Sequence, residues 1–441
     1  MIAKKLANYA YNLKYEDLNK DAIHAVKRHF IDALGCAIGA KNELPIKIIR
    51  KSLTHLHAER NALLYGAMIR YLDYNDTYLG KEPAHPSDNF GGILATAEAN
   101  KSKARDFITA AALGYEIQCR LCDAASLRAH GWDHVIYGAM SQALAVGKIM
   151  KLNQNQLLQA LNLNLSTNLS TRQVRESTDL SMWKAAAFSN VARNAVLFSK
   201  LSKNGMTGPN EIIEGKYGIM RMLTGKFKLS FCCNLNAFGK RKSRFKIQDC
   251  WLKNWPAEIH SQSVINCALD LRDQIPNLDK IKKIKIRTHE AGYTIIGSGP
   301  EKWKPKTRET ADHSIPYLVG SALYYGNINK NVFTKKALTN KKVLDIVSKV
   351  EVKEDKKLTK LYPGAAANEM TIYIKGSKNL KKKILYHRGH PKNPMTEKEI
   401  EAKFHRLASR YLNKTKRDKI INSVWNMDKT NTFNWSVLRK I

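Results

Sequence analysis

The sequence predicts a mainly α fold, in which a smaller α+β domain is inserted into a large all-helical domain. Apolar residues recur at three- and four-residue spacings from the start to about residue 225, which is typical of packed helices. Strand-like alternation starts only after residue 251, and helical sequence returns after Pro394. We therefore expect a helical domain at 1–250, an α+β domain at 251–392, and helices at 393–441 that return to the helical domain.

The helical region begins after Asn19, where one apolar face follows. This face comprises Ala22, Ala25, Val26, His29, Phe30, Ala33 and Leu34. Gly35 and Gly39 are predicted to end this helix, because glycine disfavours helix interiors. Further Ala-rich helices are expected at residues 91–99, 104–122, 137–151, 154–163 and 182–203.

The inserted region is predicted from strand periodicity. Ile284, Ile286 and Thr288 alternate with basic residues, which indicates a half-buried strand. Residues 349–353 and 369–374 are expected to form two more strands, with helices at 315–325 and 334–337 between them. After this region, Thr396 and Glu399 fit a capping box that opens the C-terminal helices.

The charge of the chain is unusual: 74 Lys and Arg against 38 Asp and Glu give a net charge of +36. Such a charge suggests nucleic-acid binding, but the densest basic runs are short and scattered, at 240–244, 280–287, 335–336, 341–342 and 378–383. No zinc-finger spacing or aromatic RNA-binding motif accompanies them. We therefore expect no nucleic-acid partner, and infer that the field steers anionic substrates such as polycarboxylates.

Other classes of protein are excluded by simpler counts. No stretch of about 18 apolar residues is present, so no membrane span is expected. The seven cysteines are odd in number and scattered, which argues against a disulfide framework and fits a reducing compartment. With no signal-peptide pattern at the start, the sequence predicts a cytoplasmic protein.

Two polar segments lie in the helical region close to each other in sequence. Residues 72–77 (Leu-Asp-Tyr-Asn-Asp-Thr) and 85–89 (His-Pro-Ser-Asp-Asn) combine carboxylates, a hydroxyl and an imidazole in a loop. Asp73, Thr77 and His85 are therefore candidates for acid–base chemistry. The same residue types also cap helices, and composition alone does not separate the two roles.

Two further candidates stand at predicted helix starts. His134 ends the segment His-Gly-Trp-Asp-His, where a helix N-terminus lowers the pKa of an imidazole; a structural histidine is the alternative. Lys184 follows Trp183 at the start of an Ala-rich helix and is a candidate for binding a substrate carboxylate. With so many lysines in the chain, an exposed surface lysine is the alternative for Lys184.

The last two candidates belong to the inserted domain. Lys253 opens the segment 253–262 at the junction of the two domains, and Tyr317 lies in the segment 308–317, one turn into a helix near the domain interface. Capping and junction packing are the alternatives for both.

Gly297 and Gly299 lack the spacing of a dinucleotide site. Cys119 and Cys122 have CxxC spacing, but they lie in helical sequence without a second such pair, which favours packing over a metal or iron–sulfur site.

Taken in order, several motifs make the chain resemble the MmgE/PrpD family over essentially its whole length. Besides 72–77 and 85–89, they are Gly-Tyr-Glu-Ile at 114–117, Gly-Met-Thr-Gly-Pro at 205–209, Pro-Ala-Glu-Ile-His-Ser-Gln at 256–262 and Ala-Asp-His-Ser-Ile-Pro-Tyr at 311–317. The last two look more like the 2-methylcitrate dehydratase branch than the cis-aconitate decarboxylase branch.

The resemblance implies a helical body, an inserted α+β lid, an active site between them without metal or cofactor, and a homodimer. The polar site residues of the family fall on Asp73, Thr77, His85, His134, Lys184, Lys253 and Tyr317. On this basis His85 and His134 are expected to transfer protons, Asp73 to orient an imidazole, and Tyr317 to donate to the leaving hydroxyl or a carboxylate. Thr77, Lys184 and Lys253 are expected to bind the substrate.

The expected activity is that of a dehydratase acting on 2-methylcitrate in propionate breakdown. A cis-aconitate decarboxylase or a related tricarboxylate lyase or isomerase is the alternative within the family, because one pocket could serve either reaction. A basic nucleic-acid-binding protein is the alternative from a different class.

Overall fold

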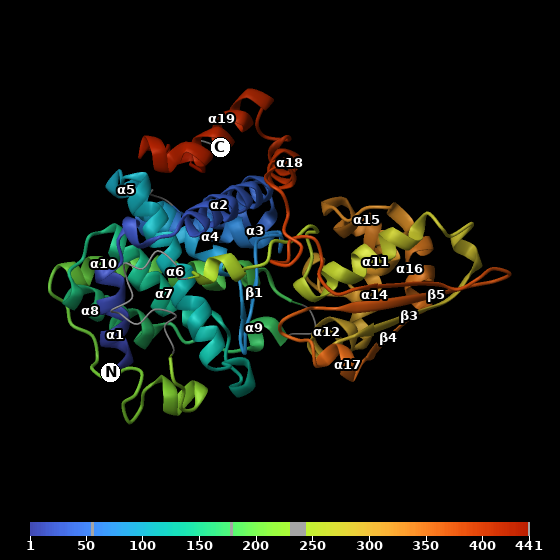
Figure 1. Ribbon diagram of the computed structural model, residues 1–441, viewed down its shortest axis with the longest axis horizontal. Coiled ribbons are helices and arrows are strands. Elements are labelled where there is room, and N and C mark those ends of the chain that lie inside the picture. Colours follow the sequence, from blue (N-terminus) through green and yellow to red (C-terminus); the bar gives the residue numbers. More distant parts are fainter. Residues whose placement is uncertain (54–56, 177–179, 230–243, 440–441) are drawn as a thin grey trace. The chain divides into compact units, whose positions relative to one another are not determined.

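The computed structural model describes residues 1–53, 57–176, 180–229 and 244–439. The chain forms two compact units. Unit 1 comprises Met1–Arg175, Met182–Trp251 and Thr396–Ile441, and unit 2 comprises Leu252–Met395 with the short segment Glu176–Ser181. Helices make up most of the regular structure (Figure 1), so the predicted mainly α class is confirmed. Residues 240–243 of the first basic run lie outside the described residues.

Unit 1 is built from helices packed on one another. α4 packs against α5 and α10, α6 against α7, and α18 against α2. The helices are α1 (Ile2–Asn12), α2 (Lys20–Ala40), α3 (Leu44–Ser52), α4 (Ala58–Tyr71), α5 (Asn89–Asn100), α6 (Ala104–Ala124), α7 (Val135–Ile149), α8 (Gln154–Thr167), α9 (Gln173–Glu176), α10 (Ala187–Lys203), α18 (Glu397–Ala408) and α19 (Lys414–Thr430).

The prediction that Gly35 and Gly39 end their helix is wrong, because α2 continues to Ala40. Both glycines instead allow α18 to approach α2 closely. A Cβ atom on Gly35 would lie 3.2 Å from the Cα atom of Phe404, and one on Gly39 would lie 3.1 Å from the side chain of Leu407. The missing side chains therefore serve helix packing. Thr396 caps α18 in the capping box expected from the sequence.

A small hairpin interrupts the helices of unit 1 between α4 and α5. Its strands are β1 (Tyr78–Leu79) and β2 (Pro83–Ala84), which pair antiparallel with Tyr78 opposite Ala84. A short 3₁₀ helix, Pro86–Asp88, leads from the hairpin into α5. The segment expected to be a loop is therefore partly a hairpin, and its two ends are Thr77 and His85.

Unit 2 contains a four-stranded sheet with the order β4-β3-β5-β6, in which only the β3–β4 pair is parallel. α11 packs on β5 and β6, and α14 packs on β4 and α16, so helices cover one face (Figure 1). The elements are α11 (Gln262–Arg272), β3 (Ile281–Thr288), α12 (Glu290–Gly292), α13 (Arg308–Ala311), α14 (Ile315–Tyr325), α15 (Lys335–Leu338), α16 (Lys341–Ser348), β4 (Val350–Glu354), α17 (Lys356–Thr359), β5 (Asn368–Ile374) and β6 (Leu380–Ile384).

The burial of β3 follows the predicted alternation, with Ile284, Ile286 and Thr288 buried and basic residues on the opposite face. β6 was not predicted, because its sequence Leu-Lys-Lys-Lys-Ile resembles a charged surface run. It is an edge strand, a position where lysines prevent pairing with other chains.

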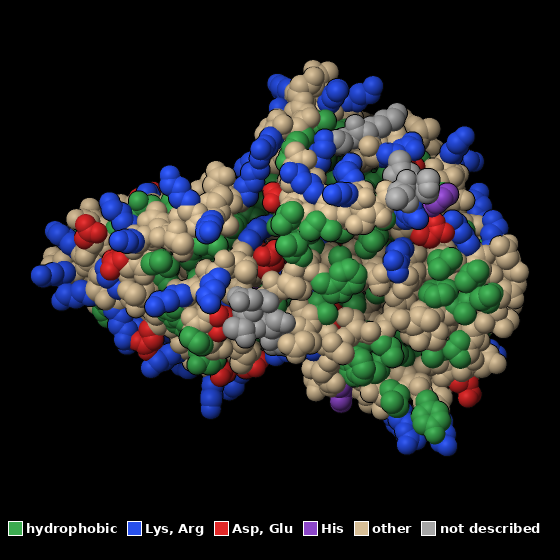
Figure 2. Space-filling model, turned by 180° about the vertical axis from the view of Figure 1, so that it is seen from behind, with side chains coloured by type: hydrophobic (Ala, Val, Ile, Leu, Met, Phe, Trp, Pro, Cys, Tyr) green, Lys and Arg blue, Asp and Glu red, His purple; other side chains and the backbone are tan. Residues whose placement is uncertain are grey.

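On the face of the molecule seen in Figure 2, basic side chains do not form one continuous patch. Figure 2 shows Lys and Arg scattered over the visible face among acidic and neutral groups. Among the described residues, every helix is too short or too polar to cross a membrane.

Candidate active site

The hairpin of unit 1 brings Thr77 beside His85. The Thr77 backbone also pairs with Trp251: the Thr77 amide donates to the Trp251 carbonyl at 2.9 Å, and the Trp251 amide donates to the Thr77 carbonyl at 2.7 Å. Thr77 Oγ1 lies 3.2 Å from Nδ1 of His85. The hydroxyl is buried and the imidazole is half-buried.

The orientation of the His85 imidazole is fixed by the backbone. Its Nδ1 lies 2.7 Å from the carbonyl oxygen of Asp76, and because a carbonyl can only accept, Nδ1 is the donor. In neutral His85, Nε2 therefore carries the lone pair. This is the tautomer that a general base needs.

The side chain of Asp76 ties this loop to the helical core. One oxygen accepts from Nδ1 of His29 and from the Tyr115 hydroxyl, both at 2.7 Å, and the other accepts from the Ser87 amide at 2.9 Å. Burial alone would raise the pKa of Asp76, but these bonds lower it below its ordinary value. Asp76 is thus a buried carboxylate that positions His85.

His134 has the opposite tautomer from His85, so that its Nδ1 is a hydrogen-bond donor. It is the N-cap residue of α7, as its sequence position suggested. Its Nε2 lies 3.4 Å from Nη2 of Arg175, and because a guanidinium can only donate, Nε2 accepts and Nδ1 carries the hydrogen. The His134 and His85 rings lie 5.8 Å apart between centroids. The pair therefore offers one acceptor and one donor.

The pKa of His134 is lowered to about 3. Burial is the main cause, and the positive charges of Arg175 and Arg70 add to it against the opposing effect of Asp133. The sequence predicted a depressed pKa from the helix N-terminus, whereas the structure attributes it to desolvation and arginines. His134 is consequently neutral at physiological pH.

Asp133 and Arg175 form an ion pair next to His134. Arg175 Nε donates to Asp133 Oδ2 at 2.9 Å, and its Nη1 donates to the Lys184 carbonyl at 3.2 Å. Burial would raise the pKa of Asp133, yet the positive charges of Arg175 and Arg172 hold it at about 2. Arg175 therefore connects His134 to the segment that carries Lys184.

Asp73 lies between two cations. Its carboxylate is 3.0 Å from Nη1 of Arg70 and 3.0 Å from Nζ of Lys184. Asp73 has φ +50°, a left-handed conformation that is uncommon outside glycine, although aspartate and asparagine adopt it more often than other residues. Lys184 is buried, so the alternative of an exposed surface lysine is wrong.

A second carboxylate, Asp88, also lies near Arg70, with 3.9 Å between Oδ2 of Asp88 and Nε of Arg70. Asn75 Nδ2 donates to its other oxygen at 2.9 Å. Burial raises the pKa of Asp88 to about 7, although Arg70 and Arg175 oppose the shift. Asp88 is therefore poised to change charge near neutral pH.

Lys253 belongs to unit 2, and its side chain is fully buried. The preceding residue, Leu252, makes two backbone contacts. The Leu252 amide donates to the Gly389 carbonyl at 3.0 Å, and the Leu252 carbonyl lies 3.2 Å from Nε2 of His387. A Cβ atom on Gly389, where φ is +107°, would lie 2.1 Å from the Leu252 carbonyl oxygen. Glycine is thus required where the two segments cross.

Tyr317 occupies a different environment from the one expected. It lies in the hydrophobic core of unit 2 on α14. Its hydroxyl donates to the Val332 carbonyl at 2.5 Å, and burial raises its pKa to about 12. The hydroxyl hydrogen is committed to a backbone acceptor, and the catalytic role expected for Tyr317 stays a prediction.

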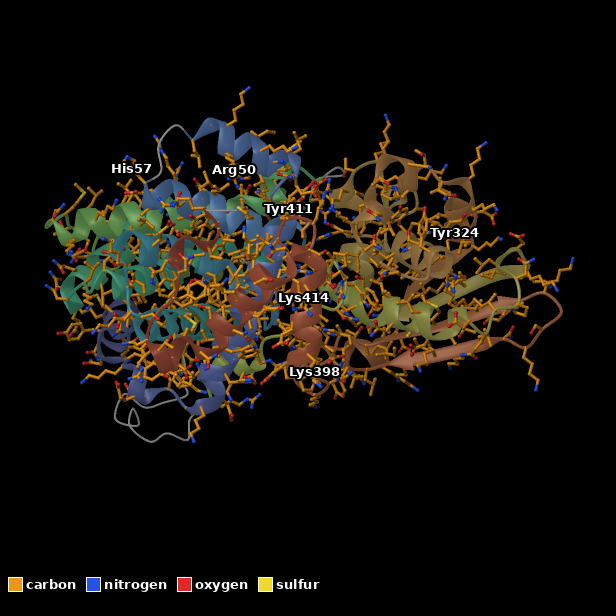
Figure 3. All side chains as sticks on the ribbon, turned by 90° about the horizontal axis from the view of Figure 1, so that it is seen from above. Arg50, His57, Tyr324, Lys398, Tyr411 and Lys414 are labelled. Carbon is orange, nitrogen blue, oxygen red and sulfur yellow. The ribbon has the colours of Figure 1, made fainter. Side chains whose placement is uncertain are left out.

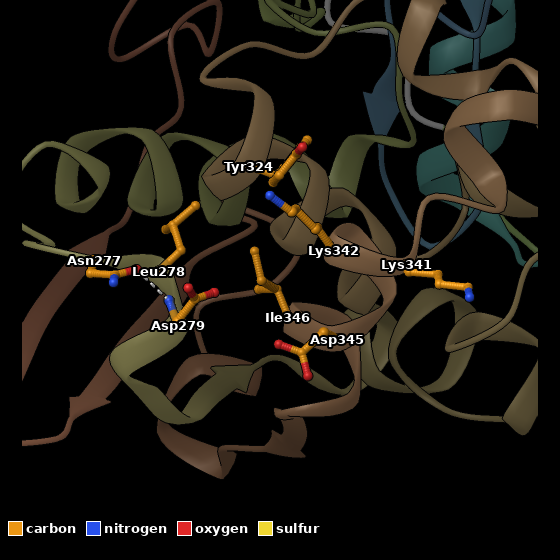
Figure 4. Close-up of a pocket in the computed structure, with 8 residues that line it drawn as sticks. All are labelled: Asn277, Leu278, Asp279, Tyr324, Lys341, Lys342, Asp345 and Ile346. Carbon is orange, nitrogen blue, oxygen red and sulfur yellow. Dashed lines mark hydrogen bonds between the residues drawn. The ribbon is translucent and has the colours of Figure 1, made fainter.

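Two other features of the described residues do not add to the site. A groove of about 430 Å³ in unit 2 (Figure 4) is lined by exposed charges of both signs, such as Asp279 and Lys342, and by no histidine. Cys119 and Cys122 are buried on α6, as the packing interpretation predicted, with Cys119 Sγ 3.8 Å from Cys250 Sγ.

Comparison with known proteins decides the family. The model of the MmgE/PrpD N-terminal domain matches residues 4–232, and that of the MmgE/PrpD C-terminal domain matches residues 255–428. The chain belongs to the MmgE/PrpD family. The resemblance seen in the sequence motifs is thereby confirmed.

Several MmgE/PrpD relatives that the chain matches carry dehydratase names. It is 27% identical to the 2-methylcitrate dehydratase of Escherichia coli, over 82% of this chain and 80% of that protein. It is 28% identical to the probable 2-methylcitrate dehydratase of Saccharomyces cerevisiae, over 82% of this chain and 75% of that protein. A fungal alkylcitrate dehydratase is 27% identical, over 91% of this chain and 86% of that protein. The expectation of an enzyme of the hydro-lyase class is confirmed by these matches.

Within this MmgE/PrpD chain, five of the predicted residues form one connected network in unit 1: Asp73, Thr77, His85, His134 and Lys184. The Asp73 carboxylate pairs with Arg70 and Lys184. The Asp76 carbonyl accepts from His85, and Asp133 acts on His134 through Arg175, which donates to both. Asp76 and Asp133 therefore join the candidate site, and the expected role of Asp73 in orienting an imidazole stays a prediction.

Several residues of the network carried no signal in the sequence that pointed to them. Asp76 and Asp133 stood inside the segments singled out, but nothing in the sequence distinguished them from Asp73 or from capping residues. Arg70 precedes Asp73 by three positions on α4, a spacing at which helical side chains meet. Arg175 carried no such signal among the 74 basic residues of the chain.

Proposed function

We propose that the protein is a dehydratase of hydroxy-tricarboxylates that converts 2-methylcitrate into 2-methyl-cis-aconitate. The observation that carries the proposal is the His85–His134 pair, which offers a proton acceptor and a neutral donor 5.8 Å apart between ring centroids. The pair lies in a network that also contains Arg70, Arg175 and Lys184. The names of the relatives support the same reaction class.

The first chemical requirement is a base for a carbon-bound proton next to a carboxylate. Nε2 of His85 would take this proton, because Nδ1 is occupied by the Asp76 carbonyl. The electron pair of the broken C–H bond then forms the double bond as the C–O bond to the hydroxyl breaks. The proton held by His85 leaves with the hydroxide as water, which balances the reaction.

The second requirement is stabilisation of the charge that develops. His134 stays neutral because burial holds its pKa at about 3, so it would act as a hydrogen-bond donor through Nδ1 rather than by releasing a proton. The Thr77 hydroxyl would bind a substrate oxygen beside His85. Lys184 would hold a carboxylate by a charge-assisted hydrogen bond.

Lys253 is proposed to bind a second carboxylate of the substrate, as the resemblance implied. Replacing Lys253 by alanine should raise KM for a tricarboxylate. The proposal for Lys253 is separate from that for the unit 1 network, because the two belong to different units.

The test is a side-by-side assay of 2-methylcitrate, citrate and cis-aconitate with the purified chain. We expect an unsaturated product from 2-methylcitrate, with lower rates on citrate. Release of carbon dioxide from cis-aconitate, without alkene formation from either hydroxy acid, would replace the dehydratase by a decarboxylase. Isomerised tricarboxylate without net loss of water would point to an isomerase.

A further inference from the structure

Lys403 of α18 is a lysine without exposed surface. Its Nζ lies 2.6 Å from Oδ1 of Asp32 on α2 and donates to the backbone carbonyl of Tyr74 at 2.7 Å. The same ammonium group lies 3.7 Å from the centroid of the Tyr74 ring. All three contacts are within unit 1.

The close packing of α18 on α2 brings Lys403 to this position. The next residue along α18, Phe404, lies against Gly35, three residues after Asp32. Although burial by itself favours the neutral amine, Asp32 and its other neighbours raise the pKa of Lys403 above its ordinary value. The lysine is therefore charged, and its hydrogen bond to the Tyr74 carbonyl is charge-assisted.

The carbonyl that Lys403 holds belongs to the loop of the candidate site. Tyr74 directly follows Asp73, whose backbone has φ +50° and whose carboxylate pairs with Lys184. A backbone in this region is maintained only by its surroundings. Arg406, one turn further along α18, donates to the Tyr74 hydroxyl at 3.0 Å, so two cations of one helix hold one residue of the loop.

A stabilising role alone is a weak explanation for such a lysine. A buried ion pair pays a large desolvation cost, and replacing both partners by apolar residues is often neutral for stability. The contact with the loop backbone, by contrast, is specific for a donor at this position.

We propose that Lys403 is a positioning residue of the active site, because it holds the loop at 73–77 through the Tyr74 carbonyl. This loop carries Asp73 and Thr77, and its Asp76 carbonyl orients His85. The C-terminal helix α18 is thereby part of the functional machinery of unit 1, although none of its residues was assigned to the site. This inference deepens the proposed function and rests on it.

The experiment compares Lys403→Met with the double variant Asp32→Asn/Lys403→Met. In the single variant Asp32 is left buried without its partner, so the free energy of unfolding should fall. The double variant removes both charges and should regain most of the lost stability. In both, kcat for the tricarboxylate should fall by about 10- to 100-fold, the effect of a displaced catalytic group, while KM changes less.

The matched control is Lys398→Met, an exposed lysine on the same helix (Figure 3), which should leave kcat and stability unchanged. Lys403→Arg keeps the donor and the charge, and should retain more activity than Lys403→Met. Should the Lys403 variants fail to fold, Arg406→Met serves instead, because Arg406 is exposed and its contact with the Tyr74 hydroxyl is peripheral. This variant should lower kcat to a smaller extent.

Hydrogen exchange of the backbone at 73–77 separates this inference from the proposed function. Exchange there should be faster in the double variant than in wild type, whatever the substrate proves to be. Unchanged exchange together with wild-type kcat in a stable double variant would overturn the inference. A wild-type chain that dehydrates no tricarboxylate would overturn the proposed function, while faster exchange would still support the positioning role.

Discussion

Nδ1 of His85 donates to the backbone carbonyl of Asp76 at 2.7 Å, which leaves Nε2 as the proton acceptor of the neutral ring. The Asp76 carboxylate is in turn fixed by His29 and Tyr115, each at 2.7 Å. The tautomer of His85 is therefore set by the helical core of unit 1. This relationship assigns the base in the proposed dehydration to His85 and the neutral donor to His134.

Lys184→Ala should raise KM for the tricarboxylate by about 10- to 100-fold, the loss of one charge-assisted hydrogen bond. Its amine lies 3.0 Å from Asp73, so removal also leaves a buried carboxylate with one cation fewer. Steady-state kinetics measure the effect. Lys203→Ala, an exposed lysine at the end of α10, is the control and should behave as wild type. An unchanged KM in Lys184→Ala would remove Lys184 from substrate binding.

His134→Asn should lower kcat by about 10²–10³-fold, the effect of removing one preorganised donor. Because the pKa of His134 is about 3, its titration lies below the acid limb of the pH–rate profile. The pH of that limb should therefore be the same in the variant and in wild type. Loss or displacement of the limb in His134→Asn, but not in the exposed control His130→Asn, would show that His134 titrates during catalysis.

Asp88→Asn should stabilise the folded chain at alkaline pH. The pKa of Asp88 is about 7 in the folded protein against 3.8 for a free carboxyl, so between these pH values the folded state binds more protons than the unfolded one. The free energy of unfolding of wild type therefore loses the contribution of Asp88 as the pH rises from about 4 to above 7.

Urea unfolding of Asp88→Asn and wild type at pH 5 and pH 8 tests this sign. Relative to wild type, the variant should be more stable at pH 8 than at pH 5. The opposite order would mean that Arg70 lowers the pKa of Asp88 instead, as an ordinary ion pair does.

Exhaustive chelation should leave the dehydratase activity unchanged. The proposed steps use imidazole, ammonium and guanidinium groups of the chain, and burial raises the pKa of the Cys119 and Cys122 thiols, which disfavours the thiolate form that binds metals. Activity and visible absorption are measured before and after chelation. Activity that is lost and then restored by iron would make the cysteines ligands and refute the proposal.

The helical periodicity of the sequence predicted most elements correctly, because an apolar face must pack wherever it occurs. It was wrong at Gly35, where glycine serves a close helix crossing rather than a helix end, and at β6, where lysines protect a sheet edge. At Gly35 the deciding factor was a neighbour distant in sequence, Phe404 of α18. Periodicity contains no information about such a neighbour.

The candidate site was predictable to the extent that its motifs are local. Thr77 and His85 belong to one hairpin, and His134 caps the helix that its sequence predicted. Arg175 was not predictable, because its role depends on Asp133, 42 positions away. Tyr317 is the opposite case, because its motif was recognised in the sequence but the partner of its hydroxyl was not. That partner is the Val332 carbonyl of the same unit.

The central claim is that His85 removes the carbon-bound proton, and His85→Gln tests it most directly, because glutamine retains a donor but cannot accept a proton at neutral pH. Turnover of 2-methylcitrate is followed by the appearance of the alkene in the NMR spectrum, for wild type and variant under the same conditions. We predict that kcat falls by about 10²–10⁴-fold, the contribution of one general base, while KM stays within a few-fold of wild type. A variant that forms the alkene at the wild-type rate would contradict the account.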